Sequence, residues 1–396
     1  MRLFDGIQNG GSEAASYTEP NFVFLNRTSR EEFARIRDLL EVWFERYPTT
    51  EQSEFRSRFR SSNDFQHQAA FFELFLHEMF LRLGCKLKLH PSLDKTTKVP
   101  DFLIDHQASH KFYLEATVAT GETADETAAR ARENTVYEVL DRRVESPDYF
   151  LSLSVSGSPE SPPPARKLAN YINGELGLLD YDEIARIYRL DGLRNLPRWH
   201  FDHSGWHIEI QPIPKSKLRG KSGVRPLGAR STGIRMVDNW TPIRDSIIEK
   251  GSKYGELDMP YVIAVNALEP VDTIDILQAL YGQEEYIIDI SGASSVASEP
   301  RLRRKPNGVW VGPNGPQCTR ISAVLMVTRL STYNIPRAGL HLYHNPWAQK
   351  PYESVLTQLH QAIPIDGKLH WVDGKNADTI FKLSPTWPDV ACQETP

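Results

Sequence analysis

The chain has 396 residues, of which 40% are hydrophobic and 24% charged, as is ordinary for a soluble globular protein. That length suits two or three domains or one elaborated domain, and no apolar run approaches the roughly 20 residues of a membrane helix. The net charge of -5 does not mark the whole chain as a nucleic-acid binder. The N-terminal segment lacks the apolar stretch of a secretory signal, and Cys85, Cys318 and Cys392 lie far apart. We therefore expect a cytoplasmic protein with no disulfide framework and no membrane partner.

Two helices are predicted in the N-terminal part of the chain. Residues 1–27 show little regular pattern, and a first helix is expected to start at Ser29, because Glu32 follows at the spacing of a capping box. A second helix is expected over residues 64–83. It carries apolar residues on most of its sides, which predicts a buried helix, and Gly84 is a suitable end for it.

The next segment predicts a β-hairpin with a carboxylate on each strand. Asp101 stands at the start of the first strand, Glu115 lies near the end of the second, and the turn is expected near Gln107. Side chains alternate along a strand, so Glu115 shares a face with Tyr113 and Thr117. In an antiparallel hairpin with this turn, positions 101 and 115 lie nearly opposite each other. The sequence therefore predicts two carboxylates in close contact.

Beyond residue 120, helices and strands alternate, which predicts an α/β or mixed α+β class. Helices are expected at about 126–144, 165–176, 181–189, 242–254 and 271–281, and strands at 148–157, 206–211, 260–266, 285–290, 320–329 and 338–344. Residues 158–164 form a Pro-rich turn or linker, and residues 291–317 are expected to form a long loop.

Two acids this close raise the pKa of one of them and repel each other. A divalent cation removes the conflict, and hard oxygen ligands suit Mg²⁺ or Mn²⁺. Glu73 is a third acid, in the middle of the buried helix, where an unpaired carboxylate is costly. We therefore expect Glu73, Asp101 and Glu115 to hold a metal ion together.

These residues also carry a resemblance to a known family. A helical Glu, then Pro-Asp, then about a dozen residues and a strand with Glu-x-Lys resembles the PD-(D/E)XK phosphodiesterase superfamily, the restriction-endonuclease-like fold. The match here is Glu73, Pro100-Asp101 and Glu115-Ala116-Thr117. It covers roughly residues 64–120, and residues 242–266 fit a return to the same core. The resemblance implies a mixed sheet flanked by helices and metal-dependent hydrolysis of a nucleic-acid phosphodiester bond by activated water.

The sequence departs from the family pattern at Thr117, where the family has a lysine. Three explanations are open. A lysine reaches the site from helix 242–254, with Lys253 and Lys250 as candidates; or Thr117 and water suffice; or the site is degenerate and only binds. We favour the first and count Lys253 as catalytic together with Glu73, Asp101 and Glu115. An exposed helix lysine is an equally open interpretation of Lys253.

Each acid also has a purely structural explanation. Asp101 is placed to cap a turn after a proline, Glu115 to pair with an arginine such as Arg130 or Arg132, and Glu73 to pair with a buried His or Arg. The combination of all three at this spacing is what favours a metal site.

Two basic segments are candidates for phosphate contact. Residues 215–235 hold seven Lys or Arg and no acid, and residues 301–305 read RLRRK. Both carry Gly or Pro within or beside them and are expected to be loops. Solvated loop charge and a surface for nucleic-acid phosphates are both open interpretations. The candidate nucleic-acid-binding residues are Lys215, Lys217, Arg219, Lys221, Arg225, Arg230, Arg301, Arg303 and Arg304.

Three rival motifs are weaker. The segment HEMFL, beginning at His77, lacks the second histidine of a zinc protease. The segment RGKSG, beginning at Arg219, lacks the first glycine of a phosphate loop and the strand that should precede it. Asp202 and Glu209 form a second acid pair, but their spacing is short and no apolar helix with a central Glu precedes them.

The expected organisation is an N-terminal helical region (1–60), a nuclease-like core (61–157), an insertion with a basic loop (158–240), a return to the core (241–270) and a C-terminal α/β region (271–396). The leading hypothesis is a metal-dependent nuclease using Mg²⁺ or Mn²⁺. The alternative is a non-catalytic nucleic-acid-binding or assembly subunit with a degenerate nuclease fold, and an unrelated α/β interaction protein is a third option. DNA is favoured over RNA as the partner, and a homodimer is one option for the oligomeric state.

Overall fold

The computed structural model describes residues 1–6, 10–94, 96–106, 110–121, 124–157, 161–221, 225–230, 238–268, 270–287 and 301–389. The chain divides into two compact units. Unit 1 comprises Met1–Glu13, Pro20–Gly121 and Asp238–Pro396, and unit 2 comprises Ala14–Glu19 and Glu122–Val237. Unit 2 is thus an insertion in the chain of unit 1, with a short N-terminal segment added to it.

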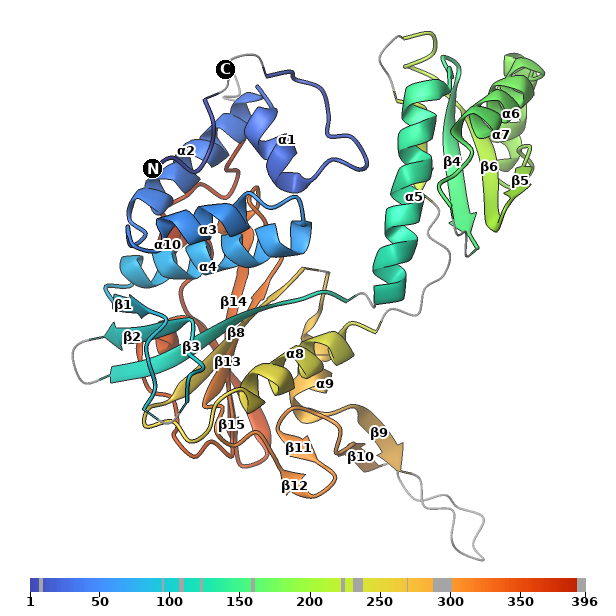
Figure 1. Cartoon of the computed structure of the whole chain (residues 1–396). Helices are drawn as coiled ribbons and strands as arrows, with labels where there is room; N and C mark the ends of the chain where they lie inside the picture. The colour runs from blue at the N-terminus through green and yellow to red at the C-terminus, as the bar shows by residue number, and fades with distance from the viewer. Residues whose placement is uncertain are drawn as a thin grey trace, which may run out of the picture. The chain divides into compact units, whose positions relative to one another are not determined.

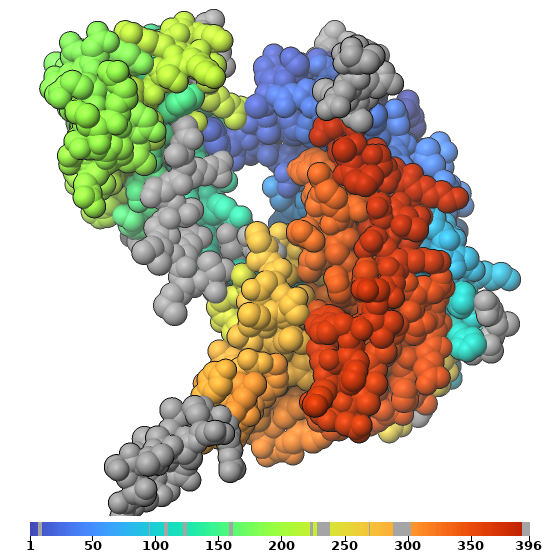
Figure 2. Space-filling view, turned by 180° about the vertical axis from the view of Figure 1, so that it is seen from behind, coloured from blue at the N-terminus to red at the C-terminus, as the bar shows by residue number. Residues whose placement is uncertain are grey.

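Unit 1 is built on an eight-stranded mixed sheet with strand order β1-β2-β3-β8-β13-β14-β15-β16 (Figure 1). The strands are β1 (Lys86–Leu89), β2 (Phe102–His106), β3 (His110–Ala119), β8 (Tyr261–Ala267), β13 (Ala323–Thr328), β14 (Gly339–His344), β15 (His360–Ile365) and β16 (Lys368–Val372). Strands β3, β8 and β13 are parallel to one another, as are β14 and β15, and the other neighbours are antiparallel. The C-terminal strands belong to the side of unit 1 that Figure 2 shows in orange to red.

Helices cover both faces of this sheet. One face packs against α1 (Asn21–Arg27), α2 (Glu31–Glu45), α3 (Gln52–Phe59), α4 (Asp64–Arg82) and α10 (Ala377–Phe381), and the other against α8 (Trp240–Ser252) and α9 (Thr273–Tyr281) (Figure 1). Helix α4 is buried along most of its length because apolar residues occupy most of its sides. A large mixed sheet flanked by helices confirms the expected α/β class. No helix of the described residues is long and apolar enough to span a bilayer.

The N-terminal segment is more ordered than the sequence pattern indicates. Leu3 and Phe4 are buried, and their backbone N–H groups donate to the carboxylate of Glu41 at 3.0 and 2.8 Å. The helix expected from Ser29 begins at Glu31, and α1 precedes it. The described residues among the first 20 form no helix or strand, in line with the weak sequence pattern, but buried apolar side chains and α1 at residues 21–27 add to the helical layer over the sheet.

The hairpin of β2 and β3 has the expected register. Phe102 pairs with Leu114 and His106 with His110, and Gln107, where the turn was expected, lies outside the described residues. Pairing of β2 with β3 stops at Leu114, whereas β3 continues beside β8 as far as Ala119. Within the described chain, this leaves the outer edge of β3 beyond Leu114 without a neighbouring strand. The sheet therefore has a step at the start of β2.

The region expected to be one long loop after residue 290 contains three short strands. Its described part holds β10 (Arg301–Arg304), β11 (Val311–Gly312) and β12 (Gly315–Pro316). Strand β10 pairs with β9 (Glu284–Ile287), so the RLRR segment is a strand and not a loop. Cross-strand partners, described below, explain why four residues rich in arginine adopt this form.

Unit 2 has a four-stranded sheet of order β5-β6-β4-β7 and three helices. Its elements are α5 (Ala124–Arg143), β4 (Tyr149–Ser156), α6 (Ala165–Gly177), α7 (Tyr181–Asp191), β5 (Trp199–His203), β6 (Trp206–Pro214) and β7 (Leu227–Arg230). Its main core joins α5 and α6 to one face of the sheet. Helix α5 and strand β4, which the sequence analysis placed in the nuclease-like core, belong to this unit.

Candidate active site

Asp101 lies at the step in the sheet. It directly precedes β2, and its Oδ2 accepts a hydrogen bond from the backbone N–H of Ala116 at 2.7 Å. The carboxylate thus takes the place of the next ladder carbonyl, which β2 no longer supplies. Because Phe102 pairs with Leu114, Asp101 is brought beside Glu115. The hairpin therefore brings the two carboxylates together.

Glu115 is fully buried and has three partners, one in the last turn of α8 and two in the residues just after it. Its Oε1 accepts from the Nζ of Lys250 at 3.0 Å and from the Nζ of Lys253 at 2.6 Å. Its Oε2 lies 2.6 Å from the hydroxyl of Tyr254, which is also 2.7 Å from the carbonyl of Val99 and shares its one proton between them. A buried carboxylate thus has both oxygens hydrogen-bonded.

Helix α8 can reach Glu115 because it packs closely on the sheet. Ile243, Ile247 and Gly251 recur every four residues on its buried side. A Cβ on Gly251 would lie 2.6 Å from the Cδ1 of Ile321, so only glycine fits this approach without a shift. The hydroxyl of Tyr261 donates to the carbonyl of Lys250 at 3.0 Å and anchors the helix end. The packing of Ile247 and Gly251 against the sheet therefore holds Lys250 and Lys253 over β3.

The charges in the site act on one another. Burial, followed by the charge of Glu115, raises the pKa of Asp101 to about 6, against the N–H of Ala116, which lowers it. Smaller effects come from Glu73, which raises that pKa, and from Lys250, which lowers it. Burial and the hydrogen bond to Glu115 raise the pKa of Tyr254 far above its usual value, so its hydroxyl keeps its proton. Asp101 is thus poised to exchange a proton near neutral pH.

Glu73 does not join the two strand carboxylates as a ligand set. Its Oε1 accepts from the hydroxyl of Tyr47, and its Oε2 pairs with Arg58 at 2.7 Å. This matches the structural explanation in which Glu73 pairs with an arginine. In the part of the chain that the structure covers, no three His, Cys, Asp or Glu side chains gather as a metal site. The negative charge of Glu73 nevertheless lies near enough to act on Asp101.

Asp101 and Glu115 form a donor set that suits a hard cation held by two carboxylates. Oδ2 of Asp101 is engaged by Ala116, and no described group bonds its Oδ1. Oε1 of Glu115 already accepts two hydrogen bonds, so a metal at that oxygen would need one ammonium group to give way, whereas Oε2 accepts one. Water and substrate oxygens would complete the coordination, as is usual for Mg²⁺. The residues present fit a two-carboxylate site rather than the three-carboxylate site expected from the sequence.

The chain has Thr117 where the family pattern has a lysine, and two lysines from another part of the chain lie beside Glu115. Lys253 and Lys250, the two candidates from helix 242–254, both lie on Glu115, with side chains 31% and 25% exposed. Neither Arg130 nor Arg132 is its partner in the described contacts. Sequence reasoning missed Tyr254, which lies two residues beyond the end of α8 and so carries no helical periodicity that would place it beside Lys250.

Most of the basic loop residues that the structure describes hold unit 2 together. Lys215 is buried, and its Nζ donates to the carbonyl of Ser146 at 2.7 Å. Arg219 pairs with Asp148 at 3.1 Å and lies over the ring of Tyr181. These two residues are engaged within the protein.

Arg225 is engaged in the same way, pairing with Asp141 at 3.3 Å and donating to the carbonyl groups of Ala14 and Ala15. Lys217 and Lys221 are exposed. Only these last two of the five present a free surface to a phosphate.

The arginines of β10 form cross-strand pairs. Arg303 lies opposite Glu285 and 3.6 Å from its carboxylate, and Arg304 lies opposite Glu284 at 2.5 Å. Each such pair stabilises a two-stranded ribbon by about 0.2–1 kcal/mol. The side chains of Arg230 and Arg301 lie outside the described part of the chain.

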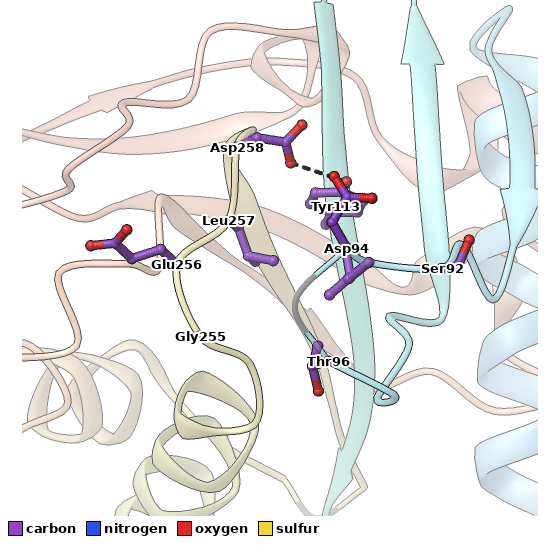
Figure 3. Close-up of a pocket in the computed structure, with 9 residues that line it drawn as sticks. Ser92, Asp94, Thr96, Tyr113, Gly255, Glu256, Leu257 and Asp258 are labelled. Atoms are coloured by element: carbon purple, nitrogen blue, oxygen red, sulfur yellow. Dashed lines mark hydrogen bonds between the residues drawn. The ribbon is translucent and has the colours of Figure 1, made fainter.

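A cavity of about 290 Å³ lies on the same sheet face as Glu115 (Figure 3). Tyr113, two residues before Glu115, borders it and donates to Asp258 at 3.1 Å. Asp94 and Glu256 also line it. The carboxylates that line this cavity repel anions. A phosphate backbone is therefore not expected to enter the site through the cavity.

Comparisons with protein-family models, with characterised proteins and with solved structures give no significant match to this chain. The likeness to the restriction-endonuclease-like superfamily therefore depends on the residues and the site geometry described above.

Proposed function

We propose that this protein is a metal-dependent nuclease with a restriction-endonuclease-like core, in which Asp101 and Glu115 hold Mg²⁺ or Mn²⁺. The observation that carries the proposal is the pair of α8 lysines on Glu115, at 2.6 and 3.0 Å. They supply the positive charge that Thr117 cannot. Two converging carboxylates with an adjacent ammonium group are the constellation that phosphodiester hydrolysis needs.

Each residue of the site has its own role in the proposed reaction. A bound divalent metal supplies Lewis-acid polarisation of the phosphate and a water of lowered pKa. Asp101 and Glu115 orient the coordination sphere from a rigid hairpin. Lys253 places its ammonium group where charge develops on the phosphate oxygens, and a fixed charge in a partly buried site is effective there. Tyr254 holds the carboxylate of Glu115 in position.

Access to the site is supported by the step in the sheet. Beyond Leu114, the edge of β3 is not covered by β2, and Asp101 lies at that edge. A nucleic-acid strand is expected to approach there, with DNA favoured over RNA. Within unit 2 considered by itself, Lys217 and Lys221 are exposed and suited to contact with a phosphate backbone.

A second candidate function has one observation in its favour. Both oxygens of Glu115 are already hydrogen-bonded to Lys250, Lys253 and Tyr254. A degenerate nuclease fold would show such saturation, with the carboxylate acting only as a structural anchor. The protein would then bind nucleic acid, or assemble on it, without cleaving it.

One experiment separates the two functions. The purified full chain is incubated with supercoiled, linear and single-stranded DNA and with RNA, in Mg²⁺, in Mn²⁺ and in EDTA. We expect metal-dependent cleavage that falls at least about 100-fold in Asp101→Asn and Glu115→Gln, as for loss of a group that stabilises transition-state charge. The matched control is Asp105→Asn on the same hairpin, whose carboxylate pairs at the surface with Lys111 at 3.4 Å.

The outcomes are distinct. Intact substrates together with salt-sensitive binding support the degenerate binder and refute the nuclease. Intact substrates without binding refute both. Cleavage that persists in Asp101→Asn and Glu115→Gln places the activity elsewhere or in a contaminant.

A further inference from the structure

Two ammonium groups share one carboxylate oxygen in the candidate active site. The Nζ atoms of Lys250 and Lys253 lie 3.0 and 2.6 Å from Oε1 of Glu115. A single negative charge does not balance two positive charges in a buried place. One ammonium group is therefore in excess at this oxygen, and Lys250 makes the longer of the two contacts.

The two lysines differ in their second partner. The Nζ of Lys253 lies 5.3 Å from the centre of the Tyr254 ring, within the range of a cation–π contact. Among the described contacts, the Nζ of Lys250 has Glu115 as its partner and no aromatic ring. If a dication neutralised Glu115, Lys250 would lose that partner, whereas Lys253 would keep the ring of Tyr254.

We propose that Lys250 is a placeholder cation: in the metal-free protein its ammonium group stands in for the metal at Glu115, and metal binding displaces it. This inference rests on the proposed function. The exchange breaks one hydrogen bond, from Nζ of Lys250 to Oε1 of Glu115, and forms one metal–oxygen contact. No covalent bond changes. The ammonium group moves outward, which is feasible because its flexible side chain is already 25% exposed.

A placeholder has two consequences for the site. It keeps the buried carboxylate of Glu115 charged and oriented while no metal is bound, avoiding an unpaired buried charge. It also competes with the metal, because an ammonium ion and a dication repel each other at the same oxygen. Lys250 therefore weakens metal binding, and Lys253 is the lysine that remains at the site for the phosphate.

The test measures metal affinity and not cleavage. Mn²⁺ alone is titrated calorimetrically into the full chain at pH 7.5, using wild type, Lys250→Met, Lys253→Met and Glu115→Gln. We expect Lys250→Met to bind Mn²⁺ at least about tenfold more tightly than wild type, because a competing positive charge is gone. Lys253→Met is the comparison variant, and we expect it to gain clearly less affinity than Lys250→Met, because the ammonium group of Lys253 keeps a second partner in the ring of Tyr254.

A second measurement uses the wild type alone, so it does not depend on a variant that folds. Lysine acetylation by a small reagent is followed by mass spectrometry with and without Mn²⁺. We expect Mn²⁺ to speed modification of Lys250 at least about threefold and to leave Lys253 nearly unchanged, because a displaced ammonium group is more accessible.

The results that overturn the proposal are separable from failure of the metal site. Mn²⁺ binding that is unchanged or weaker in Lys250→Met, or equally strengthened in Lys253→Met, refutes the placeholder and leaves the metal site standing. Mn²⁺-independent labelling of Lys250 in a protein that binds Mn²⁺ does the same. A wild type that binds no Mn²⁺, with Lys250→Met equally inert, refutes the metal site and the placeholder together.

Discussion

The surroundings of Asp101 disfavour the charged form of its carboxyl group. Burial and the neighbouring charge of Glu115 raise its pKa from 3.8 to about 6. Above that pH the carboxylate is ionised, and its ionisation in these surroundings lowers the stability of the folded chain. Residues kept in this condition are characteristic of functional sites, because a purely structural position would be filled by a neutral side chain.

The substitution Asp101→Asn tests this at the level of stability. The amide oxygen can still accept from Ala116, while the charge is removed. We expect Asp101→Asn to raise the free energy of unfolding at pH 7.5 by about 1–2 kcal/mol, allowing for partial exposure of the side chain. The gain should be fully present above about pH 6 and shrink as the pH falls from 6 towards 3.8, because only below 3.8 is wild-type Asp101 largely protonated in both states.

Urea unfolding at pH 4, 5, 6 and 7.5 measures this effect. A destabilised Asp101→Asn at pH 7.5, or a gain that does not depend on pH, would show that the carboxylate is not strained. Asp105→Asn, on the same strand and paired with Lys111, is the control and should show no such gain.

Tyr254 is expected to stabilise the fold through its hydroxyl group. Its removal in Tyr254→Phe leaves Oε2 of Glu115 and the carbonyl of Val99 without their shared donor. We expect a loss of about 1–3 kcal/mol in the free energy of unfolding, as for a hydrogen bond to a buried charged group. Tyr188→Phe, at an exposed position on α7, should change it by less than about 0.5 kcal/mol. Equal stability of both variants in urea would contradict the prediction.

At the scale of elements, α8 and β3 form the site together, and their distance is set by a glycine. Gly251 lies between Lys250 and Lys253 on the helix and faces Ile321. A larger residue must push the helix away from the sheet or displace Ile321. The lysines would then move with respect to Glu115.

The substitution Gly251→Ala should therefore destabilise the protein by about 1–3 kcal/mol, although alanine favours helix formation. The loss should shrink in the Ile321→Val background, because valine lacks the Cδ1 atom that the new Cβ meets at 2.6 Å. Thermal unfolding of the four variants of this double-mutant cycle gives the coupling.

Gly174→Ala in α6 is the control for helix propensity. A Cβ at Gly174 would meet nothing within 4 Å. We expect this substitution to stabilise the chain by roughly 0.5–1 kcal/mol. If Gly251→Ala stabilises equally, close packing of α8 does not position the lysines.

At the scale of the whole molecule, unit 2 is inserted between the two elements of the site. The chain leaves unit 1 after β3 and returns just before α8. Each unit has its own apolar core. Two separate cores predict that the units fold independently, as domains usually do.

A chain in which residues 122–237 are replaced by a flexible Gly/Ser linker should keep the fold of unit 1. We expect circular dichroism of a mixed α/β protein, one cooperative thermal transition and retained Mn²⁺ binding. The intact protein should show an additional transition for unit 2. An excised chain that is insoluble or melts without cooperativity would contradict independent folding.

Tyr17→Ala assigns the transitions. Tyr17 belongs to unit 2, where its ring packs against Tyr137 and its N–H donates to Glu138 at 2.9 Å. The substitution should lower the midpoint of the unit 2 transition and leave that of unit 1 unchanged.

Features that depend on local sequence patterns were predicted better than features that depend on contacts between elements distant in the chain. The buried helix α4 and the register of the β2–β3 hairpin were predicted correctly, because periodicity and turn position are local properties. Strands β15 and β16 were missed, since Pro364 interrupts the apolar pattern of the first. The partners of Glu73 could not be foreseen, because Tyr47 and Arg58 come from other elements.

The sequence by itself determined that Asp101 and Glu115 meet, because strand alternation and a short turn place residues 101 and 115 opposite each other whatever surrounds them. Only the tertiary structure decided which cations face Glu115. Lys250 and Lys253 are 135 and 138 residues away along the chain, beyond the whole of unit 2. The packing of α8 through Gly251 selects them, and neither composition nor periodicity encodes a contact between two faces that meet only when the chain is folded.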